Sequence, residues 1–131
     1  METQLNMKKS VSVMLVEDEI DALQLLNDVL VAKYPAITLY TAINGKIALE
    51  LYKTHIPDIV ITDINMPDIC GNQLSNKIFE TNSGAKLIAI TGKSCNICSE
   101  NIGTYFQHII EKPLDFKQLF AVIDQCIGEL M

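Results

Sequence analysis

Short apolar runs alternate with amphipathic stretches along most of the chain. Apolar or alternating runs predict five strands, at residues 10–16, 37–42, 58–62, 85–91 and 108–111. Apolar residues at helical spacing predict helices over residues 20–34, 46–53, about 73–81, and from Pro113 onward; the polar stretch 92–103 predicts at most a short helix. This order predicts an α/β fold, a single (βα)₅ domain whose doubly wound, five-stranded parallel sheet carries helices on both faces.

Capping and turn residues mark several of the helix ends. Asp18 or Glu19 can cap the first helix, and Pro35 stops it. Asn44-Gly45 predicts a turn before the second helix. Pro113 suits the first turn of the last helix, because its missing N–H has no partner there in any case.

Composition narrows the class of protein. The chain has 131 residues, of which 49% are hydrophobic and 20% charged, as expected for one globular domain. The net charge is −6 and all ten basic residues are lysines, which argues against direct nucleic-acid binding and suits cations or basic protein surfaces. The sequence has no apolar run of about 18 residues and no recognisable signal peptide, so we expect a cytoplasmic protein without membrane insertion, whose four cysteines are free thiols.

Candidate chemistry gathers at one edge of the predicted sheet. The first strand is followed by Glu17-Asp18-Glu19, and the third by Asp63. The fourth strand ends at Thr91, and the fifth at Glu111-Lys112-Pro113. Because ligands bind beyond the carboxyl ends of parallel strands, we expect these residues to form one site.

The acidic turn after the first strand decides what this site can hold. It carries three acids and no glycine, whereas a nucleotide phosphate needs a glycine-rich or hydroxyl-rich turn. Two like charges ~4 Å apart repel by about 4 kcal/mol at an effective dielectric constant of 20. A divalent cation would relieve this repulsion, and carboxylate oxygens suit Mg²⁺ or Mn²⁺ better than zinc. Each residue alone has an ordinary structural explanation, such as a helix cap, but their convergence favours a metal site.

These residues lie within a pattern that resembles the receiver domain of two-component response regulators. The resemblance is carried by Val16-Glu17-Asp18-Glu19, the run ITDINMPDICG at 61–71, Ile90-Thr91-Gly92 and Glu111-Lys112-Pro113, with a further match at residues 44–50. It spans nearly the whole chain and implies the flavodoxin-like strand order 2-1-3-4-5. It also implies an N-terminal extension at residues 1–9, a receiver domain at 10–131, and a chain that is either a stand-alone regulator or a fragment of a larger regulator or hybrid kinase.

The resemblance implies a metal-assisted phosphoacceptor site. Asp63 would be the phosphoacceptor, taking a phosphoryl group from the phosphohistidine of a sensor histidine kinase or a histidine phosphotransfer protein. Asp18 and Asp63 would ligate Mg²⁺ (or Mn²⁺) together with the backbone carbonyl of Asn65, and Glu17 would hold a metal-bound water. The domain would be a signalling phosphoacceptor in a phosphorelay and no enzyme in the usual sense.

The resemblance also implies how the signal leaves the site. Lys112 would pair with one phosphoryl oxygen, and the Thr91 hydroxyl would hydrogen-bond another. The Lys112–Pro113 peptide bond would be cis. The face formed by the fourth helix, the fifth strand and the last helix would then change, and a downstream protein or an attached output domain would read it.

Two features depart from the family pattern. The family usually has Tyr or Phe three residues before the lysine, whereas this chain has Ile109, with Tyr105 and Phe106 earlier. The output mechanism therefore differs or another side chain carries it. Cys95 and Cys98 form a C-x-x-C pair that the resemblance does not explain.

Two alternatives belong to other classes of function. A pseudo-receiver would use the same fold as an unphosphorylated interaction module, and only Ile109 favours it. A Mg²⁺-dependent phosphatase would need an acid two residues after its nucleophile, where this chain has Asn65.

Overall fold

The computed structural model describes residues 11–66, 69–92 and 105–130. Five parallel strands form one sheet in the order β2-β1-β3-β4-β5. The strands are β1 (Ser12–Val16), β2 (Thr38–Ala42), β3 (Ile59–Asp63), β4 (Lys86–Thr91) and β5 (His108–Glu111). This arrangement confirms the doubly wound parallel sheet and the strand order 2-1-3-4-5.

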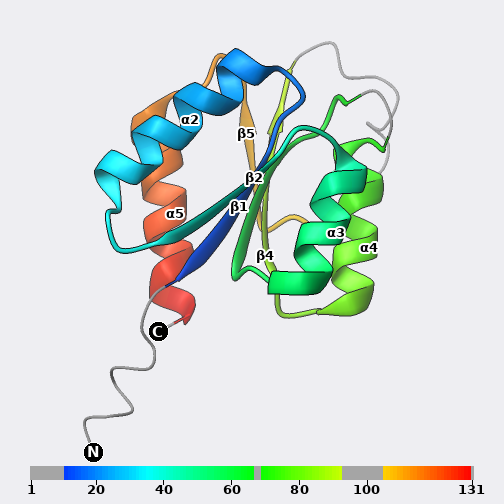
Figure 1. The fold of residues 1–131 in the computed structure, drawn as a ribbon. Coiled ribbons are helices and arrows are strands. Elements are labelled where there is room, and N and C mark those ends of the chain that lie inside the picture. The colour runs from blue at the N-terminus through cyan, green and yellow to red at the C-terminus, as the bar shows by residue number, and fades with distance from the viewer. Residues whose placement is uncertain (1–10, 67–68, 93–104, 131) are drawn as a thin grey trace, which may run out of the picture.

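Helices cover both faces of the sheet. Within the described residues they are α2 (Ile20–Lys33), α3 (Gly45–His55), α4 (Gly71–Thr81) and α5 (Phe116–Leu130). Figure 1 shows α2 and α5 on one face and α3 and α4 on the other. Nearly all of the stretch 92–103, for which the sequence predicts at most a short helix, lies outside the described residues. None of the helices in the described part of the chain combines the length and apolar character that crossing a bilayer requires.

The strands feed two separate apolar cores, one on each face. In β1, Val13 and Leu15 belong to the core under α2 and α5, whereas Met14 and Val16 belong to the core under α3 and α4. The central strand β3 is buried along its whole length. A strand that is covered on both faces is largely apolar, which is why the inner strands β1, β3 and β4 appear in the sequence as nearly continuous apolar runs. The edge strand β2 is partly exposed and alternates instead.

The strand register aligns the carboxyl ends that carry the candidate site. Val16 of β1 pairs with Thr62 of β3, so the residues that follow this pair lie at the same edge of the sheet. They are Glu17, directly after β1, and Asp63, at the end of β3. Thr91 of β4 pairs with Glu111 of β5, which brings Lys112 to that edge. Asp63 is the last residue of β3, one position further along the strand than predicted.

Side-chain caps begin two of the helices and correct two expectations. The Asn44 side chain accepts the Ile47 N–H at 2.8 Å, so Asn44-Gly45 begins α3 directly. The Asp115 side chain accepts the Lys117 N–H at 2.9 Å just before α5. The prediction that Pro113 lies in the first turn of the last helix is wrong, because the helix begins after this aspartate cap.

Candidate functional site

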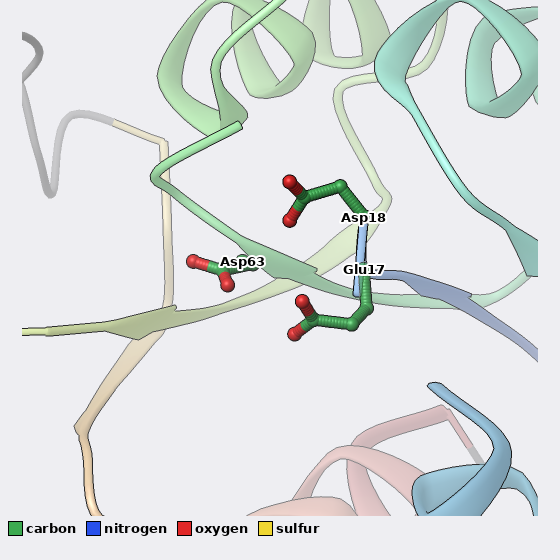
Figure 2. A group of neighbouring side chains, drawn as sticks. All are labelled: Glu17, Asp18 and Asp63. Carbon is green, nitrogen blue, oxygen red and sulfur yellow. The ribbon is translucent and has the colours of Figure 1, made fainter. Parts of the chain in front are cut away.

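Three carboxylates meet at the carboxyl edge of the sheet. Glu17 and Asp18 directly follow β1, and Asp63 ends β3. One oxygen from each lies within 4.8 Å of the others, and Figure 2 shows the three carboxyl groups lying side by side. Glu17 and Asp63 are buried and Asp18 is exposed. Carboxylates this close repel one another, and their oxygens are the donors that Mg²⁺ and Mn²⁺ prefer, so this set of residues fits a divalent cation.

A lysine neutralises part of this negative charge. The Lys112 Nζ donates to Oδ2 of Asp63 at 2.8 Å. The Lys112 backbone N–H donates to the Thr91 carbonyl at 2.8 Å, and the Lys112–Pro113 peptide bond is cis, as the resemblance implies. Burial alone would lower the pKa of Lys112, but the hydrogen bond to Asp63 and the attraction of nearby acids outweigh burial and raise the pKa. Lys112 is therefore a permanent cation that holds Asp63 in place.

Glu17 is the most perturbed acid of the site. Burial raises the pKa of Glu17 to about 7, and the negative charge of Asp63 adds to the rise. The Glu19 N–H donates to the Glu17 carboxylate at 3.0 Å and opposes the rise, because it stabilises the ionised form. Near neutral pH, Glu17 therefore exchanges its proton easily, and a cation beside it would favour the ionised form.

One cavity joins these groups. It measures about 540 Å³ and is lined by Glu17, Asp18, Glu19, Asp63, Asn65, Gly92 and Lys112. The Asn65 backbone N–H donates to Oδ1 of Asp63 at 3.0 Å, so each Asp63 oxygen has a donor. With liquid water occupying about 30 Å³ per molecule, the cavity has room for a hydrated cation and a phosphoryl-sized group together.

Thr91 lies at the same edge but outside the cavity lining. It ends β4 and is 8% exposed. Its hydroxyl donates to the Gly92 carbonyl at 3.3 Å, and Thr91 is not among the residues that line the cavity. The structure thus brings together every predicted site residue except this hydroxyl, which faces its own backbone.

Sequence reasoning missed the physical role of Gly71. A Cβ atom at this position would lie 2.6 Å from the Asp63 carbonyl oxygen and 2.7 Å from the Ile64 Cα. The Gly71 N–H donates to the Ile64 carbonyl at 2.9 Å. The start of α4 therefore packs directly on the backbone that carries Asp63, which only glycine allows. The glycine stands in the resembling run, but the sequence alone does not say what it touches.

Comparison with known proteins assigns the family. Residues 13–124 match the family model of the response regulator receiver domain. The chain belongs to this family. It is therefore a receiver domain of two-component systems, which is a signalling domain and not a classical enzyme.

Relatives of this receiver domain are longer proteins. It is 29% identical to histidine kinase P4 of Formosa agariphila over 85% of the chain and 8% of that protein. It is 29% identical to transcription factor SKN7 of Saccharomyces cerevisiae over 89% of the chain and 19% of that protein. The receiver domain thus spans less than a fifth of the length of either relative.

A solved receiver structure has the same fold. The response regulator TrrA of Thermotoga maritima, in complex with Mg²⁺-BeF, superposes with a TM-score of 0.78 at 25% identity, covering 88% of this chain and 98% of that one. Magnesium binding is thus seen in a relative of this receiver domain, and the acidic cluster around Asp63 is consistent with it.

Three residues before Lys112, where the family usually has Tyr or Phe, the receiver domain has Ile109. Ile109 lies on β5 and is 41% exposed. Tyr105 stacks on Phe79 of α4, with ring centroids 4.2 Å apart, and Phe106 is buried. Neither Tyr105 nor Phe106 takes the exposed place that Ile109 occupies on β5.

The two cysteines in the described part of the receiver domain differ in their bonding. Cys126 is a buried free thiol, as expected. Cys70 is disulfide-bonded, so the expectation of a free thiol is wrong there. That expectation rested on the cellular compartment alone, which says nothing of the distance between cysteines in the fold. Cys95 and Cys98 lie outside the described residues.

Proposed function

We propose that Asp63 accepts a phosphoryl group from a phosphohistidine of a sensor histidine kinase or a histidine phosphotransfer protein. An Asp63 oxygen attacks phosphorus, the P–N bond breaks, and its electron pair returns to the imidazole. The observation that carries this proposal is the position of the Asp63 carboxylate. It lies in a cavity beside two other acids and is held by Lys112 on one oxygen and the Asn65 N–H on the other.

The same residues would hold a divalent cation, Mg²⁺ or Mn²⁺. Asp18, Asp63 and the backbone carbonyl of Asn65 would be its direct ligands, and Glu17 would hold a water molecule bound to it. When bound, the cation supplies positive charge that offsets the negative charge of the transferring phosphoryl group and the acids around it. The close approach of the three carboxylates, within 4.8 Å, supports this assignment.

Lys112 and Thr91 would act after the transfer. With 44% of its side chain exposed, Lys112 has room to swing its ammonium group from the Asp63 carboxylate to a phosphoryl oxygen. The Thr91 hydroxyl, whose only described partner is the carbonyl of the next residue, would turn to another phosphoryl oxygen. Both movements would reach β5 and α5, and with them the face that a partner reads.

The proposed domain boundaries and partners follow from the same assignment. Residues 1–9 would be an N-terminal extension and residues 10–131 the receiver domain. The output would be a downstream protein or an attached output domain, and the domain itself would bind neither nucleic acid nor membrane. We expect it to act in the cytoplasm, where a kinase of this class presents its phosphohistidine.

The pseudo-receiver alternative is not favoured. An unphosphorylated interaction module has no need of a complete set of site residues, yet Glu17, Asp18, Asp63 and Lys112 all line one cavity. The phosphatase alternative lacks its general acid, since the side chain two residues after Asp63 is the amide of Asn65.

Small-molecule phosphorylation tests the proposal. The protein is incubated with acetyl phosphate and Mg²⁺, and intact mass spectrometry follows the gain of one phosphoryl group, which hydroxylamine should remove because the product is an acyl phosphate. Asp63→Asn should abolish the gain. Asp28→Asn, an exposed aspartate of α2, is the matched control and should be labelled like the wild type. Undiminished labelling of Asp63→Asn would refute the assignment.

A further inference from the structure

The Glu19 carboxylate has no structural task among the described residues. Glu19 occupies the N-cap position of α2, with extended backbone angles (φ −90°, ψ 114°), but its side chain accepts no hydrogen bond from the helix. The backbone N–H of Glu19, and not its side chain, makes the hydrogen bond here, by donating to the Glu17 carboxylate. Neither of the two ion pairs within the described ranges involves Glu19. Its negative charge therefore has no direct ion-pair partner in this part of the chain.

Glu19 lies between two cavities. It lines the acidic cavity around Asp63 and also a neighbouring apolar cavity of about 320 Å³ between α2 and α5. Lys112 lines both cavities too, and the attraction of Glu19 contributes to the raised pKa of Lys112. Glu19 is exposed, whereas Glu17 and Asp63 are buried. The Glu19 charge therefore lies at the solvent-exposed mouth of the acidic cavity, where a phosphodonor must enter.

We propose that Glu19 determines which phosphodonors reach Asp63, by repelling small donors in proportion to their negative charge. This inference rests on the proposed phosphoacceptor function of Asp63. A fixed charge at a cavity mouth changes the local concentration of charged ligands several-fold at low ionic strength. A doubly negative donor such as acetyl phosphate is therefore disfavoured relative to a singly negative donor such as phosphoramidate.

Both donors carry out the same reaction at Asp63. A carboxylate oxygen forms a new bond to phosphorus in each case. With acetyl phosphate, the bond from phosphorus to the acyl oxygen breaks and acetate leaves with the electron pair. With phosphoramidate, the P–N bond breaks and the already protonated nitrogen leaves as ammonia. The donors thus differ in charge and leaving group, while Glu19 touches neither bond.

The test compares rate constants for the two donors in three forms of the protein at saturating Mg²⁺. Asp21→Asn is the matched control for Glu19→Gln, because Asp21 is an exposed acid in the first turn of α2 that lines neither cavity. Glu19→Gln should raise the ratio of the acetyl phosphate rate to the phosphoramidate rate by about threefold at low salt, and the gain should shrink as salt is added. Asp21→Asn should keep the wild-type ratio.

The outcomes separate this inference from the proposed function. An unchanged ratio in Glu19→Gln, or an equal rise in Asp21→Asn, would overturn the role of Glu19 while labelling of Asp63 persists. A rise that does not respond to salt would also overturn it, because the mechanism is electrostatic. If the folded wild type is labelled by neither donor, the phosphoacceptor function itself is wrong and the role of Glu19 fails with it.

Discussion

The Lys112 ammonium group lies 2.8 Å from Oδ2 of Asp63, although the two residues are 49 positions apart in the chain. The Asp63 side chain is 4% exposed and that of Lys112 is 44% exposed. The pair is thus buried at its acidic end and open at its basic end. Lys112 can leave this contact for water at little cost, whereas Asp63 without its partner is a buried charge beside two other acids.

Lys112→Ala should destabilise the metal-free protein but leave Mg²⁺ binding intact. Removing the ammonium group leaves the Asp63 charge uncompensated, which we expect to lower the free energy of unfolding by about 1–2 kcal/mol. Without the ammonium group, the electrostatic potential at the three carboxylates becomes more negative, which favours cation binding. Mg²⁺ should therefore raise the melting temperature of Lys112→Ala at least as much as that of the wild type. Thermal unfolding with and without Mg²⁺ measures both effects.

Lys86→Ala is the control for this variant. It removes the other described ion pair, between Lys86 and Glu129. Lys86 pairs with Ile59 at the start of β3, whereas Asp63 ends that strand. Exposed ion pairs contribute less than about 1 kcal/mol, so the loss should be smaller and the effect of Mg²⁺ unchanged. Total loss of Mg²⁺ binding in Lys112→Ala would contradict the division of roles between the lysine and the acids.

The raised pKa of Glu17 predicts how the stability of the metal-free protein depends on pH. Glu17 releases its proton near pH 7 in the folded state and near its ordinary value of 4.5 when unfolded. Between these values the folded state binds more protons, so the free energy of unfolding should fall as pH rises through this window. Glu17→Gln should remove this contribution and be more stable than the wild type at pH 8, by about 1–2 kcal/mol.

Denaturant unfolding at pH 5 and pH 8 checks the prediction for Glu17. Glu50→Gln, at an exposed position of α3, is the control and should follow the wild type at both pH values. Adding Mg²⁺ at pH 8 should stabilise the wild type more than Glu17→Gln. If Glu17→Gln lost the same stability as the wild type between pH 5 and pH 8, another group would be responsible.

Most of the fold was predictable because each strand is an apolar or alternating run and each helix has apolar residues at helical spacing. The predicted limits of β5, residues 108–111, match the structure. The start of α5 was less predictable. Pro113 and Asp115 are both common at helix starts, and only the hydrogen bond from the Lys117 N–H to Asp115 decides between them.

The site was predictable as a set of residues but not as a geometry. That Glu17, Asp18, Asp63 and Lys112 meet follows from the parallel order of the strands, which brings their carboxyl ends to one edge. The proton on Glu17 near neutral pH depends on how deeply this side chain is buried, and sequence spacing does not report burial. The hydrogen-bond partner of Thr91 likewise depends on the rotamer of its side chain, which the sequence does not report.

Gly71→Ala should strain the backbone next to the phosphoacceptor. The new Cβ would meet the Asp63 carbonyl oxygen at 2.6 Å and the Ile64 Cα at 2.7 Å, and neither backbone atom can move aside freely. We expect a loss of about 1–3 kcal/mol in the free energy of unfolding. Gly128→Ala is the matched control, since a Cβ there, within α5, has no neighbour within 4 Å. It should stabilise the protein by about 0.5–1 kcal/mol, and equal effects of the two substitutions would contradict the packing role of Gly71.

Ile56 offers a separate stability prediction at the opposite edge of the sheet. It ends α3 in the left-handed region (φ 45°, ψ 64°), and its N–H donates to the Tyr52 carbonyl at 2.8 Å. A β-branched side chain in this region costs roughly 1–2 kcal/mol, whereas glycine adopts it without penalty. Because Ile56 is 51% exposed, shortening its side chain loses little buried area. Ile56→Gly should therefore raise the free energy of unfolding by about 1 kcal/mol in urea titrations.

Ile56→Ala separates the backbone effect from loss of the side chain. Alanine keeps the Cβ atom that makes the left-handed region unfavourable, so it should recover only part of the gain seen with glycine. Ile56 lies just before the start of β3, whereas Asp63 is the last residue of that strand. Neither substitution should therefore alter the rate at which acetyl phosphate labels Asp63. If Ile56→Gly were no more stable than Ile56→Ala, the left-handed backbone conformation would not be a source of strain at this position.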